Sequence, residues 1–285
     1  MPTATEHEQR PIRPWFLLGT HHPGWLATAG IPLFVSDRRL RGYRRLPRAA
    51  AGWALDSGGF TELASHGSWE HAPTPAQYVA RVRRYAREVG RLAWAAPQDW
   101  MCEPFILAKT GRTVSEHQAR TVANYQRLRA LDPELPFVPV LQGWRVGDYL
   151  RCADRYAAAG IDLTREPLVA LGSVCRRQAT GEAEAIITAL RSVGLTCLHG
   201  FGVKTLGLAR YGHLLHSADS MAWSVAARRS QALPGCTRHR TCSNCPRYAL
   251  AWRQRLLTQL RRGAGRAEQL PLFTAMDDDT DRNAG

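Results

Sequence analysis

Eight short runs of apolar, β-branched or aromatic residues recur along the chain, with longer stretches of helical periodicity between several of them. Runs of this length, bounded by turn residues, are typical of buried strands. We expect strands at residues 15–19, 31–36, 51–56, 92–97, 136–141, 167–172, 195–201 and 217–223.

The segments between the runs carry signals for helix starts. Thr74 and Pro75 place a cap and an N1 proline before an amphipathic stretch, and Thr113 with Glu116 has the spacing of a capping box. Strands that alternate with helices pair in parallel, and eight such units favour a closed (β/α)8 barrel of the TIM type within the α/β class. Further helices are expected at 147–159, 179–193, 204–212 and 246–262.

The ends of the chain differ from its middle in composition. Residues 1–14 form a polar arm, residues 15–262 hold the expected barrel, and residues 263–285 have the polar composition of a disordered tail. The tail contains QLPLF, Gln269 to Phe273, which resembles the short motif by which bacterial DNA-metabolising proteins bind the replicative sliding clamp. A chance match is the alternative interpretation of five residues.

Composition indicates a globular protein of the cytoplasm. The 285 residues are 45% hydrophobic, which is enough to bury a sizeable core. The polar N-terminus lacks the apolar region of a signal peptide, and no window is apolar enough to span a membrane. The seven cysteines therefore indicate thiols or metal ligands and not a disulfide framework, and Cys102, Cys152, Cys175 and Cys197 are expected to be core thiols.

The charge is strongly basic, with 38 Lys and Arg against 24 acids and a formal net charge of +14. Such a balance favours a polyanionic partner, with nucleic acid as the first expectation, although an arginine-rich proteome would give the same composition. Residues 38–48 are the densest tract, with Tyr43 among the arginines. We expect contacts to nucleic acid from five of these arginines, Arg38, Arg39, Arg41, Arg44 and Arg45. The alternative is that they form only a solvated surface.

Carboxylates, amides and glycines end several of the predicted strands. In a barrel these ends meet at one rim, where the chemistry of such folds is found, whereas any single one of them is also typical of a turn or a cap. The set is Asp56-Ser57-Gly58-Gly59, Gln98-Asp99, Gln142-Gly143, Gly172-Ser173, Gly200-Phe201-Gly202 and Asp219-Ser220.

A cysteine cluster near the C-terminus predicts a metal site. Cys236, His239, Cys242 and Cys245 follow one another at three-residue intervals, a spacing typical of tetrahedral zinc with three thiolates and one imidazole. The alternatives are a fourth ligand from His213 or His216, or an iron–sulfur cluster. Four protein ligands leave no open position, so the site is expected to be structural.

The segments DSGGF at 56–60, QD at 98–99, VLQG at 140–143, ALGS at 170–173, HGFGV at 199–203 and SADSMAWS at 217–224, followed by the cysteine cluster, resemble the tRNA-guanine transglycosylase superfamily. The resemblance implies a barrel enzyme that exchanges guanine in a polynucleotide for a 7-deazaguanine through a covalent glycosyl intermediate. It implies that Asp219 is the nucleophile and Asp56 the general acid and base. It also implies base contacts from Ser57, Asp99, Gln142, Gly143, Gly172 and Ser173.

The sequence departs from the tRNA enzymes at Ser173, which stands where their loop has a second glycine, and at the residues after it. This departure and the clamp-like motif favour the DNA-directed deazapurine branch of the superfamily (DpdA-like), with 7-cyano-7-deazaguanine as an example of the inserted base. Tyr43, Phe60 and Trp100 are candidates to stack on an extruded base. The alternatives are the same exchange on tRNA, and a non-catalytic zinc-containing nucleic-acid-binding protein tethered to the clamp.

Overall fold

The computed structural model describes residues 15–175, 177 and 181–267. The expected N-terminal arm and the QLPLF motif lie outside these residues. All eight strands pair in parallel in one sheet, and each of the predicted runs overlaps one of them. The strands are β1 (Trp15–Thr20), β2 (Leu33–Ser36), β3 (Trp53–Asp56), β4 (Leu92–Ala95), β5 (Val140–Leu141), β6 (Val169–Leu171), β7 (Leu198–Gly200) and β8 (Ser217–Ser220).

Helices follow most of the strands. The predicted cap at Thr74 and the predicted capping box at Thr113 are both present, and Thr74 forms a full capping box with Gln77. Short helices after β1, β2, β3, β4 and β8 are additions to the expected set, and the one after β8 takes the last two residues of the run predicted at 217–223. The last helix continues beyond residue 262 to Ala267. The helices are α1 (Trp25–Thr28), α2 (Asp37–Leu40), α3 (Gly59–His66), α4 (Pro75–Glu88), α5 (Pro104–Thr110), α6 (Val114–Leu131), α7 (Val146–Ala158), α8 (Glu182–Ser192), α9 (Thr205–Tyr211), the 3₁₀ turn η1 (Gly212–Leu214), α10 (Ala222–Arg228) and α11 (Pro246–Ala267).

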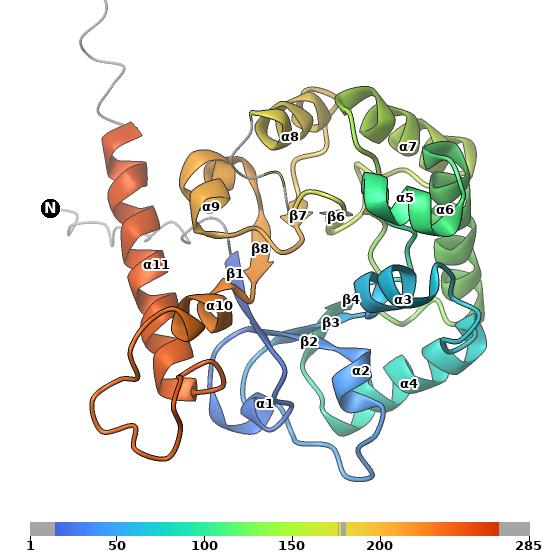
Figure 1. Ribbon diagram of the computed structural model, residues 1–285. Coiled ribbons are helices and arrows are strands. Elements are labelled where there is room, and N and C mark those ends of the chain that lie inside the picture. Colours follow the sequence, from blue (N-terminus) through green and yellow to red (C-terminus); the bar gives the residue numbers. More distant parts are fainter. Residues whose placement is uncertain (1–14, 176, 178–180, 268–285) are drawn as a thin grey trace, which may run out of the picture.

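The sheet is strongly curled, with the helices arranged around its outside (Figure 1). The strand order is β4-β3-β2-β1-β8-β7-β6-β5, so β1 pairs with β8 and joins the two ends of the chain. Between the outer strands, a parallel bridge joins Ala95 to Phe137, where the Ala95 N–H donates to the Pro136 carbonyl at 2.9 Å. The curl therefore brings the carboxyl ends of all eight strands toward one face.

Two apolar layers support that face. Inside the curl, Leu17, Ala54, Val140 and Ala170 pack together below the strand ends. A larger core fills the space between the outer face of the sheet and the helices, which explains why the strands are continuous apolar runs, since both of their faces are buried. Among the helices of the described part, none combines the length and apolar content that crossing a bilayer requires.

Helix α11 lies outside the ring of helices, beside α10 (Figure 1). The Trp252 ring on α11 packs against Phe16 of β1 with ring centroids 6.0 Å apart, and Arg253 donates to the Phe16 carbonyl at 3.4 Å. The C-terminal helix is thereby fixed to the strand at the centre of the sheet.

Candidate active site and metal centre

A cavity of about 310 Å³ lies at the carboxyl ends of the strands. Asp56 and Asp219 both line it, from β3 and β8, although they lie far apart in the sequence. The other predicted site residues in its lining are Asp99, Gln142, Gly172, Ser173, Arg38 and Arg39.

Asp219 is held in place by two donors on one carboxylate oxygen. The Gly202 N–H donates to its Oδ1 at 2.9 Å, and His199 Nε2 lies 3.3 Å from the same atom. The other ring nitrogen of His199 lies 2.9 Å from Ser217 Oγ, and the imidazole packs edge-on to Trp94 with centroids 4.7 Å apart. This buried histidine, which the sequence reasoning did not single out although it opens the HGFGV segment, therefore fixes the carboxylate.

Asp56 ends β3 at the cavity, with two glycines behind it. Burial raises its pKa, and the negative charge of Asp219 acts in the same direction, whereas the Gly58 N–H and the neighbouring Ser36 hydroxyl oppose the shift. Gly58 has φ 84°, a left-handed conformation that favours glycine. A Cβ on Gly59 would lie 3.3 Å from Asp99 Oδ1 and 3.0 Å from the Trp69 ring, so a side chain there would crowd the floor of the cavity.

Three predicted base-binding residues form one buried hydrogen-bonded group. The Gln142 amide donates to Asp99, and its carbonyl oxygen lies 2.8 Å from Ser173 Oγ. Ser173 Oγ also lies 2.8 Å from a carboxylate oxygen of Glu103 and accepts the Cys102 N–H at 2.8 Å. Burial, reinforced by the charges of Asp56 and Glu103 and opposed by the Gln142 amide, raises the pKa of Asp99 to about 7. This carboxyl therefore changes its charge near neutral pH.

Ser57 and Gly143 are the predicted base-binding residues that do not line the cavity. Ser57 is buried at 5% exposure. At Gly143 a Cβ would lie 2.7 Å from Cβ of Asp148 and 2.9 Å from the Tyr149 ring, so this glycine allows α7 to pack close to β5. Its place in the sequence is explained by packing.

Sequence reasoning also missed residues that line the cavity. Glu103 lies four residues after Asp99 and is 2% exposed, and its only sequence signal is its proximity to the QD segment. His21 follows β1 directly, and the pairing of β1 with β8 brings it to the cavity. Burial, together with nearby Arg39, lowers the pKa of His21. Cys175, expected in the core, lines the cavity as well.

Only part of the basic tract at residues 38–48 lines the cavity. Arg38 and Arg39 line it, and Arg38 also pairs with Glu62, whereas the exposed Arg41, Arg44 and Arg45 are not part of its lining. The arginines of α4 differ, because Arg81 and Arg83 pair with Asp37 and Asp132 at 2.9 Å and 2.7 Å. Among the three candidate stacking aromatics, Phe60 lines this cavity, Tyr43 is exposed outside it, and Trp100 lines a different cavity.

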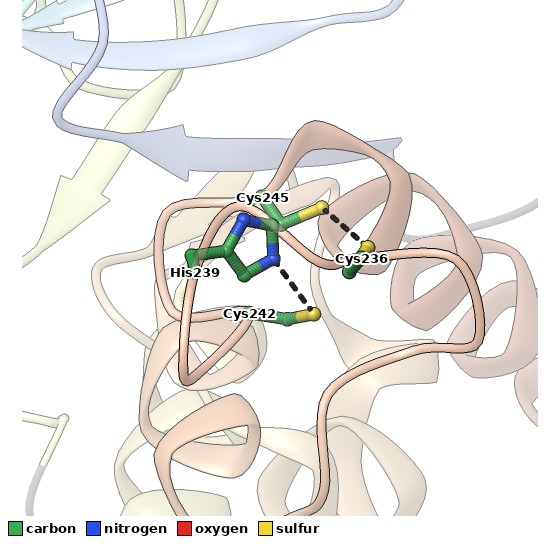
Figure 2. A group of neighbouring side chains, drawn as sticks. All are labelled: Cys236, His239, Cys242 and Cys245. Atoms are coloured by element: carbon green, nitrogen blue, oxygen red, sulfur yellow. Dashed lines mark hydrogen bonds between the residues drawn. The ribbon is translucent and has the colours of Figure 1, made fainter.

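The cysteine cluster forms a compact ligand set (Figure 2). One ligand atom from each of Cys236, His239, Cys242 and Cys245 lies within 4.8 Å of all the others. The two contacts drawn are 3.9 Å, between Cys236 Sγ and Cys245 Sγ, and 3.3 Å, from His239 Nε2 to Cys242 Sγ. Sulfur atoms bound at about 2.3 Å to one tetrahedral ion lie roughly 3.8 Å apart, so the geometry fits a metal ion. His239 is the histidine that joins the cysteines.

Comparison with known proteins identifies the family of the chain. No curated protein matches the chain significantly. The family model described as DeoxyPurine in DNA protein A, DpdA, matches residues 12–283, which is nearly the whole chain. The chain therefore belongs to the DpdA family, in the DNA-modification branch related to tRNA-guanine transglycosylases.

Proposed function

We propose that the protein is a DNA guanine transglycosylase that exchanges guanine in DNA for a 7-deazaguanine such as 7-cyano-7-deazaguanine. The observation that carries the proposal is the presence of Asp56 and Asp219 in the lining of one cavity of about 310 Å³. A base exchange that keeps the configuration at C1′ needs two displacements, and therefore one carboxylate to form the covalent link and another group to move protons.

In the first displacement, an Asp219 oxygen attacks C1′ of the target nucleotide, the bond from C1′ to the guanine nitrogen breaks, and Asp56 donates a proton to the departing guanine. In the second, Asp56 takes a proton from the incoming 7-deazaguanine, whose nitrogen attacks C1′ and releases Asp219. The raised pKa of Asp56 supports its role as the acid, and the two donors on Asp219 keep that carboxylate aimed.

The base is read by the group of Asp99, Gln142 and Ser173. Ionised Asp99 accepts the guanine N1–H and the 2-amino group, and the Gln142 amide donates to O6, with help from backbone groups at Gly172. Asp99 and Gln142 bond to each other in the structure, so entry of the base exchanges that hydrogen bond for bonds to the base. Both side chains are buried, which makes an unpaired state costly and favours the base that satisfies them.

We also infer a closed (β/α)8 barrel and a structural zinc ion. The bridge between Ala95 and Phe137 supports closure of the sheet between β4 and β5. Three cysteines and one histidine suit Zn²⁺, which would be held by Cys236, His239, Cys242 and Cys245 and would stabilise their loop. DNA as the partner is supported by the family and by the net charge of +14.

The proposal is tested by mass spectrometry of nucleosides from DNA and tRNA of cells that express the wild type, Asp219→Ala or Asp154→Ala. Asp154 is exposed on α7, away from the cavity lining, and is the matched control. We expect the deazapurine in DNA from the wild type and the control. Its amount should fall at least about 10³-fold with Asp219→Ala, because the nucleophile is lost.

Purified Asp219→Ala should still bind DNA. Full incorporation by this variant would contradict the mechanism, and a deazapurine confined to the tRNA pool would favour the tRNA alternative. A wild type that binds DNA and metal without any incorporation would favour the non-catalytic alternative.

A further inference from the structure

A second cavity, of about 450 Å³, adjoins the first. Asp99 lines the first cavity, whereas its neighbours in the chain, Gln98 and Trp100, line the second. Trp69 belongs to the same wall, because its Nε1 donates to the Asp99 carbonyl at 3.1 Å and its ring packs behind Gly59. The wall that carries the base-reading carboxylate is therefore shared by both cavities.

The second cavity is positively charged. Arg112, Arg120 and Arg127 line it, and the one acid in its lining is Glu70, which is exposed. Within the described part of the chain, neither Arg120 nor Arg127 lies within salt-bridge distance of a carboxylate, in contrast to the arginines of α4. Glu116 acts electrostatically on Arg120 and pairs with Arg112 at 4.0 Å, so the cavity keeps a net positive charge with two guanidinium groups that form no salt bridge among the described residues. Such groups attract an anion, and their planar forks match phosphate.

An aromatic ring holds one of these arginines in position. The Arg120 guanidinium lies 4.9 Å from the centre of the Trp100 ring, and that of Arg112 lies 5.9 Å from it. Trp100 is itself fixed, because it is 8% exposed and its backbone N–H donates to Thr121 Oγ1 at 2.9 Å. A stacked guanidinium keeps its N–H groups available in its own plane, which suits a ligand that brings both a phosphate and a flat ring.

A buried polar atom at the same wall lacks a partner. Gln98 is 4% exposed, its amide donates to the Pro73 carbonyl at 2.6 Å, and its backbone carbonyl accepts from Asn124 at 2.9 Å. Its Oε1 is buried and has no hydrogen-bond partner within the described part of the chain. A buried acceptor without a donor is unfavourable, so among the described residues this wall keeps one polar atom unsatisfied.

We propose that the second cavity binds one nucleotide of the DNA substrate, close in the strand to the nucleotide whose base is exchanged. Its phosphate contacts Arg120 and Arg127, and its base lies against the wall of Trp69 and Gln98. The inference rests on the proposed function and extends it to the strand around the target. Successive Cα atoms are about 3.8 Å apart, so residues that alternate between the cavities place the two sites within reach of one strand.

The test measures DNA binding by fluorescence anisotropy across a range of salt concentrations. The probes are a labelled guanine-containing oligonucleotide and, as competitors, the free mononucleotides dGMP and dCMP. The proteins are the full-length wild type, the double variant Arg120→Gln, Arg127→Gln, and the control Arg165→Gln. Arg120 and Arg127 are exposed, so the double variant should fold, and circular dichroism checks this. Arg165 is exposed in the loop before β6, outside both linings.

We expect the double variant to bind the oligonucleotide at least about tenfold more weakly at low salt. Its salt slope should be smaller by about 1, because the one phosphate held by both arginines is no longer neutralised. Arg165→Gln should match the wild type. Unchanged affinity and slope in the double variant would overturn the subsite. The subsite would also be overturned if a free mononucleotide bound tightly through these arginines while binding of the oligonucleotide did not depend on them. The occupant of the cavity would then be a free nucleotide.

The same proteins are assayed for incorporation of the deazapurine, which separates this proposal from the function. Dependence of DNA binding on Arg120 and Arg127 without any incorporation by the wild type would support the subsite and contradict the base exchange. If the double variant incorporates the deazapurine and binds DNA with wild-type affinity and salt slope, the base exchange is supported and the subsite is contradicted.

Discussion

At the scale of single residues, burial determines the chemistry of the cavity. Asp56 and Asp99 both have a raised pKa because they are withdrawn from water, and each is near another negative charge. Asp219 lies in the same lining but has the Gly202 N–H and the His199 ring on its carboxylate. Carboxyl groups in one cavity are thus given different environments, which is how one site can hold both a proton donor and a nucleophile.

A pH dependence follows from Asp99, whose pKa is raised to about 7. Only the ionised carboxylate can accept both guanine donors, so the ionisation of Asp99 should give kcat/KM for base exchange a rising limb of about tenfold per pH unit below pH 7. The measurement is a pH–rate profile of the purified enzyme. In Asp99→Asn the activity should be low and this rising limb absent; a profile with the same limb would assign it to another group.

The raised pKa of Asp99 also predicts how the stability of Asp99→Asn relative to the wild type changes with pH. The pKa of Asp99 is higher in the folded protein than in the unfolded chain, so its contribution to stability is greatest at low pH and is lost as the pH rises through about 7. Asp99→Asn should therefore gain stability relative to the wild type between pH 5 and pH 8, by roughly 1–3 kcal/mol. Urea unfolding at the two pH values measures this, and a difference independent of pH would contradict it.

At the scale of elements, the strand ends set the distances between functional side chains. Gly172 directly follows β6, and a Cβ there would overlap the amide nitrogen of Gln142, which follows β5. The atoms nearest to a Cβ at Gly172 all belong to the Gln142 side chain and none to the backbone. Glycine is therefore required here by the position of the Gln142 side chain and not by the pairing of the strands. The spacing of β5 and β6 therefore leaves room for only one of the two side chains.

Gly172→Ala should displace Gln142 from Asp99 and Ser173. Crowding of a buried side chain should lower the free energy of unfolding by about 1–3 kcal/mol. We expect the KM for the incoming base to rise at least about tenfold, because one good hydrogen bond to the base is lost. The control is Gly52→Ala before β3, where a Cβ meets nothing within 4 Å. Steady-state kinetics and unfolding of both variants check the prediction; equal KM values would contradict it.

At the scale of the whole molecule, the segment between α10 and α11 contains no regular helix or strand and is organised around the cysteine cluster. Cys242 and Cys245 are buried and join the main core, and Ser224 of α10 donates to the Ser243 carbonyl at 2.8 Å. The cluster thereby fixes the start of α11, whose Trp252 packs on β1. A metal ion at this point would link the C-terminal helix to the rest of the fold.

Removal of the metal should destabilise the protein. An ion present at about 1,000 times its Kd contributes roughly 4 kcal/mol, which corresponds to a drop in Tm of roughly 10 °C on its removal. Calorimetry with and without a chelator, together with elemental analysis of the purified protein, measures both the effect and the identity of the metal.

Cys242→Ser should lose the metal and the chelator effect, whereas Cys197→Ser, a half-buried cysteine outside the cluster, should retain both. A protein that purifies without metal, and whose Tm does not respond to zinc, would contradict the metal site.

The sequence by itself determined the parallel strands and their order in the chain, because apolar runs bounded by Gly and Asp and alternating with capped helices are local patterns. It also determined the residues at the strand ends and the three clustered cysteines, whereas the structure showed that His239, and not His213 or His216, joins them. Family membership followed from the motifs that these strand ends form.

Only the tertiary structure decided which of those residues share a cavity. Ser57 and Gly143 stand next to predicted site residues in the chain but do not line the cavity. Glu103 and His21 line it, and His199 contacts Asp219, through contacts between segments far apart in the sequence. The second cavity exists because α6 packs beside the loop that carries Gln98 and Trp100. Side-chain direction, burial and the raised pKa of Asp99 all depend on these long-range contacts, which no local pattern encodes.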